Sequence, residues 1–209
     1  MFAHRINAGD LPTMNALQQT APVDSPPTVY DNNLKMRDAL QSYFSRYHFV
    51  NGGYDLKWFK IKVGAVFIPL PNIKDRVAAV KIHDVHHVLK EYTATLEGEA
   101  EIGAWEIASG CGKYYVAWLL NFASFFYGLF FFPSSLLTAF LNGRRCKTNF
   151  YHSLPYDDHL LNRSVGDLRK MVGIEEQRKS TVKDYLCFIF WCLPVIAIPS
   201  FLLWVLFSF

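Results

Sequence analysis

The chain has 209 residues, of which 51% are hydrophobic and 16% aromatic, and its formal net charge is +3. This length suits one domain with appendages, and the apolar content exceeds what an ordinary soluble surface tolerates, which indicates a membrane. The small net charge, without a basic run interleaved with aromatic residues, argues against a nucleic-acid partner.

The amino-terminal third contains an arm, a helix and an extended segment. Residues 1–33 hold four prolines among Asn, Gln, Asp and Thr, so they predict a flexible arm, and they lack the apolar core of a secretory signal. Residues 34–48 place apolar side chains at three- and four-residue spacing, which predicts an amphipathic helix. After a Gly-Gly break, residues 58–72 predict either a short β-ribbon or an extended crossing.

The segment HDVHHVLKEYTATLEGE contains three of the seven histidines. If its first part is helical, His83 and His87 lie one above the other on one face, with Asp84 on the same turn. Glu99 begins a second helix after a Thr-rich connection. Two imidazoles and two carboxylates suit Zn, Fe, Co or Mn better than Mg or Ca. The alternative is a polar helix face in solvent. The pattern predicts a divalent metal site formed by His83, Asp84, His87 and Glu99.

The helix predicted over residues 75–90 has apolar residues on more than one stripe, so we expect it to be central and enclosed. Buried histidines without partners would each cost about 1–3 kcal/mol, which metal ligation or hydrogen bonding removes. His86 is an alternative ligand because it follows His83 by three residues. Glu91 and Glu106 are at spacings that suit carboxylates orienting an imidazole N–H, although a solvated surface role is the simpler interpretation.

Residues 114–141 contain no charge over 28 positions, and Pro133 divides them. One straight helix of this length would measure about 42 Å, longer than the roughly 30 Å hydrocarbon core. Basic residues flank both ends, which places both ends on the same side of a membrane. The segment predicts a helical hairpin partly sunk in the bilayer that offers five phenylalanines to lipid or to an isoprenoid tail: Phe122, Phe125, Phe126, Phe130 and Phe131.

Residues 144–177 return to soluble character, with Ser164 as an expected helix cap. Arg144 and Arg145 are expected to meet anionic headgroups or a substrate carboxylate. Residues 178–209 predict a carboxy-terminal membrane anchor, because 25 uncharged residues follow a basic flank. The four cysteines show no C-x-x-C pairing and suggest neither a disulfide framework nor a cysteine zinc site.

Two stretches resemble the coenzyme Q (ubiquinone) biosynthesis protein 4 family: HDVHH with Gly98–Glu99, and Asn142–Arg145 followed by Leu154–Ile174. The resemblance implies an enzyme that acts on the head ring of a polyprenylated hydroxybenzoate, removes its ring carboxylate and hydroxylates that carbon. It implies that His83, Asp84, His87 and Glu99 hold the catalytic ion, and that residues 114–141 form two helices covering it. The apolar tail after Ile174 has no counterpart in the family's core.

Together these features predict an all-α protein with a helical metal- and lipid-binding domain over residues 34–177. The expected partners are an isoprenoid lipid or prenylated quinone precursor, membrane lipid and other quinone-biosynthesis proteins. We expect an inner or cytoplasmic membrane location, with the soluble part on the cytoplasmic or matrix face. Two alternatives remain: a non-catalytic lipid-binding scaffold that keeps the site structurally, and a relative that acts on another isoprenoid lipid.

Overall fold

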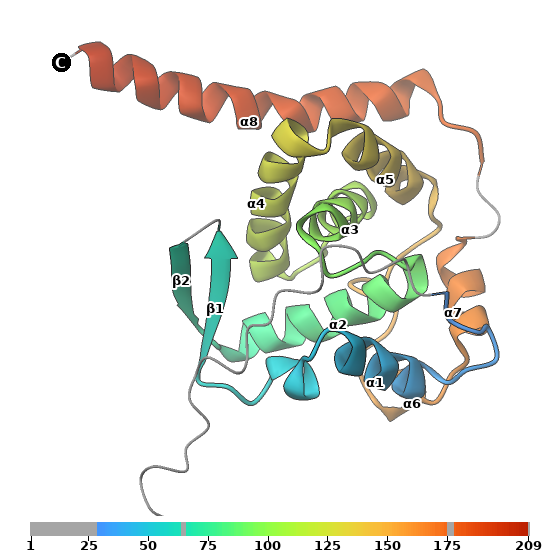
Figure 1. The fold of residues 1–209 in the computed structure, drawn as a ribbon. Helices are drawn as coiled ribbons and strands as arrows, with labels where there is room; N and C mark the ends of the chain where they lie inside the picture. Colours follow the sequence, from blue (N-terminus) through green and yellow to red (C-terminus); the bar gives the residue numbers. More distant parts are fainter. Residues whose placement is uncertain (1–28, 64–65, 175–177, 209) are drawn as a thin grey trace, which may run out of the picture.

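The computed structural model describes residues 29–63, 66–174 and 178–208, and this part of the chain is mostly helical (Figure 1). The helical fold class is therefore confirmed, with one antiparallel two-stranded ribbon in addition. The elements are α1 (Met36–Arg46), the 3₁₀ turn η2 (Val50–Gly53), β1 (Trp58–Val63), β2 (Val66–Pro71), α2 (Lys74–Lys90), α3 (Leu96–Ser109), α4 (Tyr115–Phe131), α5 (Pro133–Arg145), α6 (Asp158–Leu161), α7 (Val165–Val172) and α8 (Val182–Ser208).

Helices α2 and α3 are enclosed by the other helices. Helix α3 packs against α4 and α5, while α1, α4 and α7 pack against α2. The indole of Trp105 on α3 is fully buried, as are Phe125 of α4 and Phe140 of α5. The prediction that Phe125 faces lipid or an isoprenoid tail is therefore wrong, because its ring packs in the core against α3 and α5. On α2, buried residues stand on several faces, including Ile82, Val85 and Leu89, which confirms the expectation of an enclosed helix.

The amino-terminal predictions can be checked only where the chain is described. Helix α1 confirms the predicted amphipathic helix, and β1 pairs with β2 from Trp58 opposite Pro71 to Val63 opposite Val66, so the ribbon is the correct alternative. Tyr30 is already buried, and Arg169 of α7 donates a hydrogen bond to its carbonyl oxygen at 3.2 Å. The end of the predicted arm thus packs on the domain, while residues 1–28 lie outside the described residues.

The apolar stretch after residue 113 forms two helices, as predicted, and both pack on α3. Pro133 stands at the start of α5, where its missing N–H is not needed by the helix. Close packing requires small residues: a Cβ on Gly128 of α4 would lie 2.6 Å from the Cβ of Ala100 on α3. A Cβ on Gly143 of α5 would collide with the carbonyl oxygen of Trp105. The helix pair therefore covers the helix that carries Glu99.

Helix α8 crosses the end of the domain next to α4 and α5 and extends beyond it (Figure 1). Its indole at Trp191 stacks on Trp118 of α4 with ring centroids 5.6 Å apart. Its first turn is held by the buried carboxylate of Asp184, which accepts hydrogen bonds from Arg178 at 2.7 and 2.8 Å. Arg144 of α5, which the sequence assigned to headgroups or substrate, lies 3.5 Å from the same carboxylate. A search limited to the described residues finds no helix that combines the length and apolar character needed to cross a membrane.

Candidate metal centre

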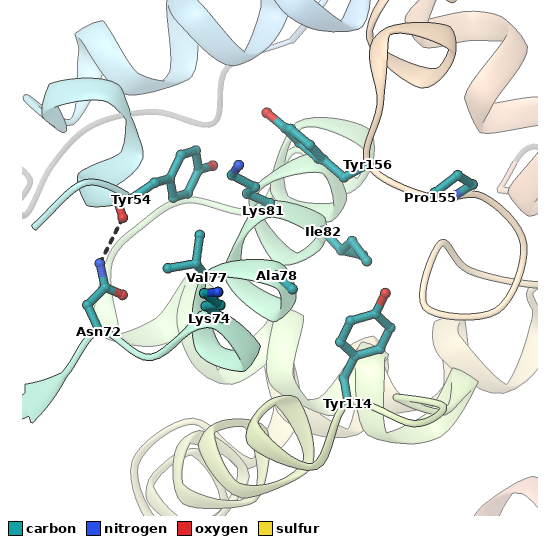
Figure 2. A pocket seen from close by; sticks show the side chains of 10 residues that line it. All are labelled: Tyr54, Asn72, Lys74, Val77, Ala78, Lys81, Ile82, Tyr114, Pro155 and Tyr156. Atoms are coloured by element: carbon teal, nitrogen blue, oxygen red, sulfur yellow. Dashed lines mark hydrogen bonds between the residues drawn. The ribbon is translucent and has the colours of Figure 1, made fainter.

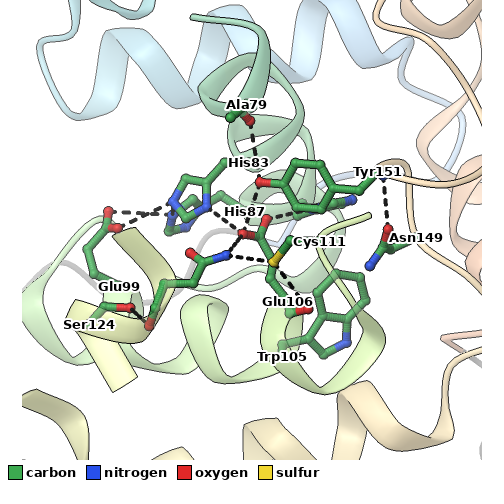
Figure 3. Close-up of polar contacts among 12 residues, drawn as sticks. Ala79, His83, His87, Glu99, Trp105, Glu106, Cys111, Ser124, Asn149 and Tyr151 are labelled. Atoms are coloured by element: carbon green, nitrogen blue, oxygen red, sulfur yellow. Dashed lines mark hydrogen bonds and ion pairs between the residues drawn. The ribbon is translucent and has the colours of Figure 1, made fainter. Parts of the chain in front are cut away.

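The turn between α2 and α3 brings three of the predicted ligands together. Glu91 caps the carboxy-terminal end of α2 with a left-handed backbone at φ of 59°. Thr95 caps the amino-terminal end of α3, and its hydroxyl accepts a hydrogen bond from the Gly98 N–H. The chain thus reverses within a few residues. Ligand atoms of His83, His87 and Glu99 lie within 4.8 Å of one another, so this group can hold a metal ion (Figure 3).

The ring nitrogens of both histidines have assigned roles. The Nδ1–H of His83 donates to the Glu106 carboxylate at 3.1 Å, and the Nδ1–H of His87 donates to the carbonyl oxygen of Tyr92 at 3.0 Å. These acceptors carry no proton at neutral pH, so each Nδ1 must carry one. In a neutral imidazole the other nitrogen is then a bare acceptor. Both Nε2 atoms therefore present lone pairs.

Those lone pairs face one another and a carboxylate. The two Nε2 atoms are 3.1 Å apart, and Glu99 oxygens lie 3.3 Å from that of His83 and 3.4 Å from that of His87. Four acceptor atoms at these distances repel one another unless a cation lies among them. A proton on one ring or a divalent ion satisfies the arrangement, and the nitrogen and oxygen donors suit zinc and its neighbours. The residues present therefore fit the predicted ion.

The electrostatics of the metal-free site agree with this need for positive charge. Burial alone would lower the pKa of His83, but the carboxylates of Glu106 and Glu99 outweigh it and raise that pKa well above its ordinary value. Conversely, burial would raise the pKa of Glu99, but the His87 and His83 imidazoles hold it far below its ordinary value. Both shifts favour a proton on His83 Nε2 in the metal-free protein, at the position that a metal would take.

Asp84, the fourth predicted ligand, is not in this group. Its carboxylate accepts a hydrogen bond from the Tyr54 hydroxyl at 2.5 Å, and burial raises its pKa to about 6 even though nearby His83 and Tyr54 lower it. One residue advances a helix by about 100°, so Asp84 points away from the side on which His83 and His87 stack. Its role as a ligand stays a prediction.

Behind the metal group lies a buried carboxylate that spacing alone could not distinguish from a surface residue. Glu106 of α3 is fully buried, seven residues after Glu99 and on the same side of the helix. It accepts hydrogen bonds from His83, from His86 at 2.6 Å and from Tyr151 at 3.1 Å. In the sequence, only its spacing of seven residues from Glu99 indicated that Glu106 lies on the same side of α3. The partners of Glu106 outside α2 come from distant parts of the chain and gave no local signal.

The alternative ligand His86 and the suggested orienting carboxylate Glu91 are both engaged elsewhere. His86 Nε2 accepts a hydrogen bond from the Phe150 N–H at 3.1 Å while its Nδ1 contacts Glu106, so both of its nitrogens are committed. Glu91 accepts a hydrogen bond from Arg169 at 2.6 Å and ties α7 to the end of α2. Two histidines outside this region also differ in their surroundings: His152 contacts the Gly110 carbonyl at 3.0 Å, and His159 is exposed on α6.

A separate pocket lies on the other side of α2 (Figure 2). Its volume is about 490 Å³, and its walls include Tyr54, Lys81, Tyr114 and Tyr156. The Lys81 ammonium lies 5.2 Å from the ring centre of Tyr54 and 5.4 Å from that of Tyr156. Tyr54 connects the pocket with Asp84, the residue next to His83 on α2, because its ring lines the pocket and its hydroxyl donates a hydrogen bond to the Asp84 carboxylate.

Searches against protein-family models, curated proteins and solved structures find no match to this chain.

Proposed function

We propose that the protein binds one divalent metal ion through His83, His87 and Glu99. The observation that supports this proposal most strongly is the pair of Nε2 atoms 3.1 Å apart, because both rings use their Nδ1 protons elsewhere. Structural zinc sites are closed by four protein ligands, whereas catalytic sites combine three with an open position. Three converging ligands favour a catalytic ion with an open position, whereas binding of Asp84, the fourth ligand that the motif predicts, would close the site.

The chain's own residues would orient a substrate at this ion. A bound divalent ion supplies Lewis acidity, which polarises a carboxylate or phenolate oxygen. The Glu99 side chain is 40% exposed, whereas that of His87 is fully buried, so the site is accessible from the Glu99 side. The Tyr43 ring stacks on His87 with centroids 5.4 Å apart and holds the ligand ring in place. Substrate would approach past the partly exposed Glu99 side chain, on the helix against which α4 and α5 pack.

We further propose that the substrate is a polyprenylated hydroxybenzoate whose ring carboxylate is replaced by a hydroxyl group. The support for this is the resemblance of HDVHH and Gly98–Glu99 to the coenzyme Q biosynthesis protein 4 family, together with the grouping of His83, His87 and Glu99. The reaction releases CO₂ and requires an oxidant such as dioxygen. A carboxylate and a phenolate on one ring are oxygen donors that suit an open metal position.

Membrane association is the third part of the proposal. Monomeric soluble proteins rarely expose large contiguous apolar patches, and such patches mark sites of interaction. Exposed basic residues stand just before α8, at Lys179, and in its first turn, at Lys183, where anionic headgroups would meet them. We propose that α8 and the outer side of α4 contact lipid, which also supplies the isoprenoid substrate. Among the described residues, the exposed apolar side chains include Leu119, Phe126, Phe130 and Phe131 on α4, and Leu186, Ile189, Phe190 and Leu193 on α8.

The test separates an enzyme from a lipid-binding scaffold. In cells whose only copy is Glu99→Gln, an enzyme loses the ligand charge that sets the acidity of a bound group, so a ring-carboxylated prenyl precursor accumulates. The matched control is Glu97→Gln, which makes the same change on the exposed side of α3. Normal quinone output from the Glu99 variant, with the protein folded and membrane-bound, would contradict the enzymatic proposal and favour the scaffold.

A further inference from the structure

Glu106, on α3, is a carboxylate that accepts several hydrogen bonds next to the candidate metal ligands. It is completely buried, and four donors converge on its two oxygens; two of them, His83 and Tyr151, are labelled beside it in Figure 3. Oε1 accepts from His86 Nδ1 at 2.6 Å. Oε2 accepts from His83 Nδ1 at 3.1 Å, from the Tyr151 hydroxyl at 3.1 Å and from the Asn121 amide at 2.5 Å. Those donors come from α2, from α4 and from the segment after α5.

The Oε1 side of this carboxylate cannot be changed freely. The Phe150 N–H is a donor only, so His86 Nε2 must accept from it, and the single proton of the neutral ring must then be on Nδ1. That proton points at Oε1. Any group placed at Oε1 therefore has to accept a hydrogen bond.

The Oε2 side determines which nitrogen of His83 carries the proton. Because Oε2 only accepts, it holds the His83 proton on Nδ1 and leaves Nε2 bare toward His87 and Glu99. We propose that Glu106 is a positioning residue that fixes this His83 tautomer and thereby sets the metal affinity of the site. The inference rests on the proposed metal binding and deepens it. Carboxylates that orient ligand imidazoles in this way typically contribute about 10- to 100-fold in metal affinity.

The substitution Glu106→Gln makes the proposal testable. The NH₂ group that it introduces cannot take the Oε1 position, because His86 would then need two bare nitrogens. It must take the Oε2 position, where His83 can accept from it only by moving its own proton to Nε2. That proton then points at His87 and Glu99 and competes with the ion. The substitution replaces one oxygen by nitrogen with almost no change in volume. It thus blocks His83 Nε2, the ligand atom that lies 3.1 Å from His87 Nε2.

The experiment compares Glu106→Gln with Glu97→Gln, an exposed residue of the same helix that accepts a hydrogen bond from Ser135. Zinc affinity is measured by competition with a chelator, and melting temperature is measured with and without zinc. We expect Glu106→Gln to bind zinc about 10- to 100-fold more weakly and to lose part of the zinc-induced rise in melting temperature, while Glu97→Gln matches the wild type. An unchanged affinity, with equal loss of stability in both states, would overturn the proposal.

A second variant distinguishes the tautomer from general damage to the buried group. It combines His86→Asn with Glu106→Gln, so that the introduced asparagine carbonyl can accept from the NH₂ group of the introduced glutamine. The glutamine carbonyl can then turn toward His83 and restore its Nδ1 proton. We expect zinc affinity to recover toward the wild type even though the Phe150 N–H loses its partner. Affinity no better than that of Glu106→Gln alone would contradict the proposal.

The wild-type protein gives a test that does not depend on the folding of any variant. Long-range ¹H–¹⁵N spectra of the zinc-loaded protein should show His83 with its proton on Nδ1, and a proton on Nε2 would overturn the proposal. If the wild type binds no zinc, the proposed function fails. The same spectra of the metal-free Glu106→Gln protein then test Glu106 separately, because loss of the His83 Nδ1 proton supports its role and a retained Nδ1 proton overturns it.

Discussion

The interior between α2 and α3 and the outer side of α4 and α8 depart from the usual distribution of side chains in opposite ways. The interior buries charged and polar groups, among them His86, His87 and Glu106. The outer side exposes large apolar groups, including Phe130 at 60% and Phe190 at 64%. Buried polar groups persist when each has a partner, and exposed apolar patches persist when something covers them.

The two regions differ in how completely the chain satisfies them. The four donors around Glu106 each meet an acceptor oxygen, whereas the two Nε2 atoms and Glu99 face one another and need a proton or a metal ion between them. Along α8 the first turns are fixed by Asp184, and Trp191 packs on Trp118, whereas residues such as Leu186 and Ile189 face outward. The interior needs a cation, and the outer side of α4 and α8 needs an apolar partner. Substitutions in the interior should therefore change metal binding, and substitutions on the outer side should change lipid binding.

The largest expected effect is on metal content. His83→Ala combined with His87→Ala removes both bare nitrogens, so purified protein should contain no stoichiometric divalent ion by elemental analysis. His152→Ala combined with His159→Ala is the matched control, because it also removes two imidazoles and should leave the content unchanged. Undiminished metal in the first variant would place the site elsewhere.

The second effect ranks the two carboxylates. Glu99 lies 3.3 and 3.4 Å from the bare nitrogens, whereas Asp84 is held by Tyr54. Glu99→Gln should weaken zinc binding by roughly 100-fold or more, because the loss of a ligand should cost at least as much as the loss of a residue that only orients a ligand. Asp84→Asn should weaken it less. Equal losses in a chelator competition would mean that Asp84 leaves Tyr54 and binds the ion.

The third effect concerns the outer side and should leave the metal untouched. Ile189→Ser combined with Phe190→Ser removes two exposed apolar side chains from α8. If lipid buries each of them at about 1.5–3 kcal/mol, vesicle binding in a flotation assay should weaken by roughly 100-fold or more. Val29→Ser, which changes an exposed apolar residue outside α4 and α8, should have no effect. Unchanged vesicle binding by the double variant would exclude this part of α8 as the lipid contact.

The fourth effect tests the packing that joins the regions. Gly143→Ala places a methyl group against the Trp105 carbonyl, so α5 must shift from α3. Overpacking of this kind costs about 1–3 kcal/mol, measurable as a lower free energy of unfolding. Ser134→Ala, at an exposed position on α5, is the control. A variant as stable as the wild type would show that α5 can move without cost.

The smallest effect is the pH dependence of the metal-free protein. Because the folded-state pKa of His83 is raised, its proton stabilises the fold fully below the unfolded value of about 6.5. That stabilisation disappears as pH rises through the folded-state pKa. Melting temperature without metal should therefore fall as the pH rises above about 6.5, less so in His83→Asn. Zinc affinity should rise over the same range, and a zinc affinity independent of pH would contradict the shared position of proton and metal.

The sequence revealed contacts that depend on helical spacing and missed those between distant segments. His83 and His87 stack because they are four residues apart, and α4 ends before Pro133 because proline cannot continue the hydrogen-bond pattern. Tyr54 is 30 residues before Asp84, so no spacing shows that it occupies this carboxylate. Likewise Arg144 was assigned to headgroups because Asp184, 40 positions later, gives no local signal of its approach.

The most direct test of the central claim is X-ray absorption or anomalous diffraction on the zinc-loaded protein. The predicted result is one ion bound by the Nε2 atoms of His83 and His87 at about 2.0–2.1 Å and by a Glu99 oxygen at about 2.0–2.2 Å, with a further position open to solvent or Asp84. An ion bound at other residues, or coordination by Nδ1 of either ring, would contradict the account.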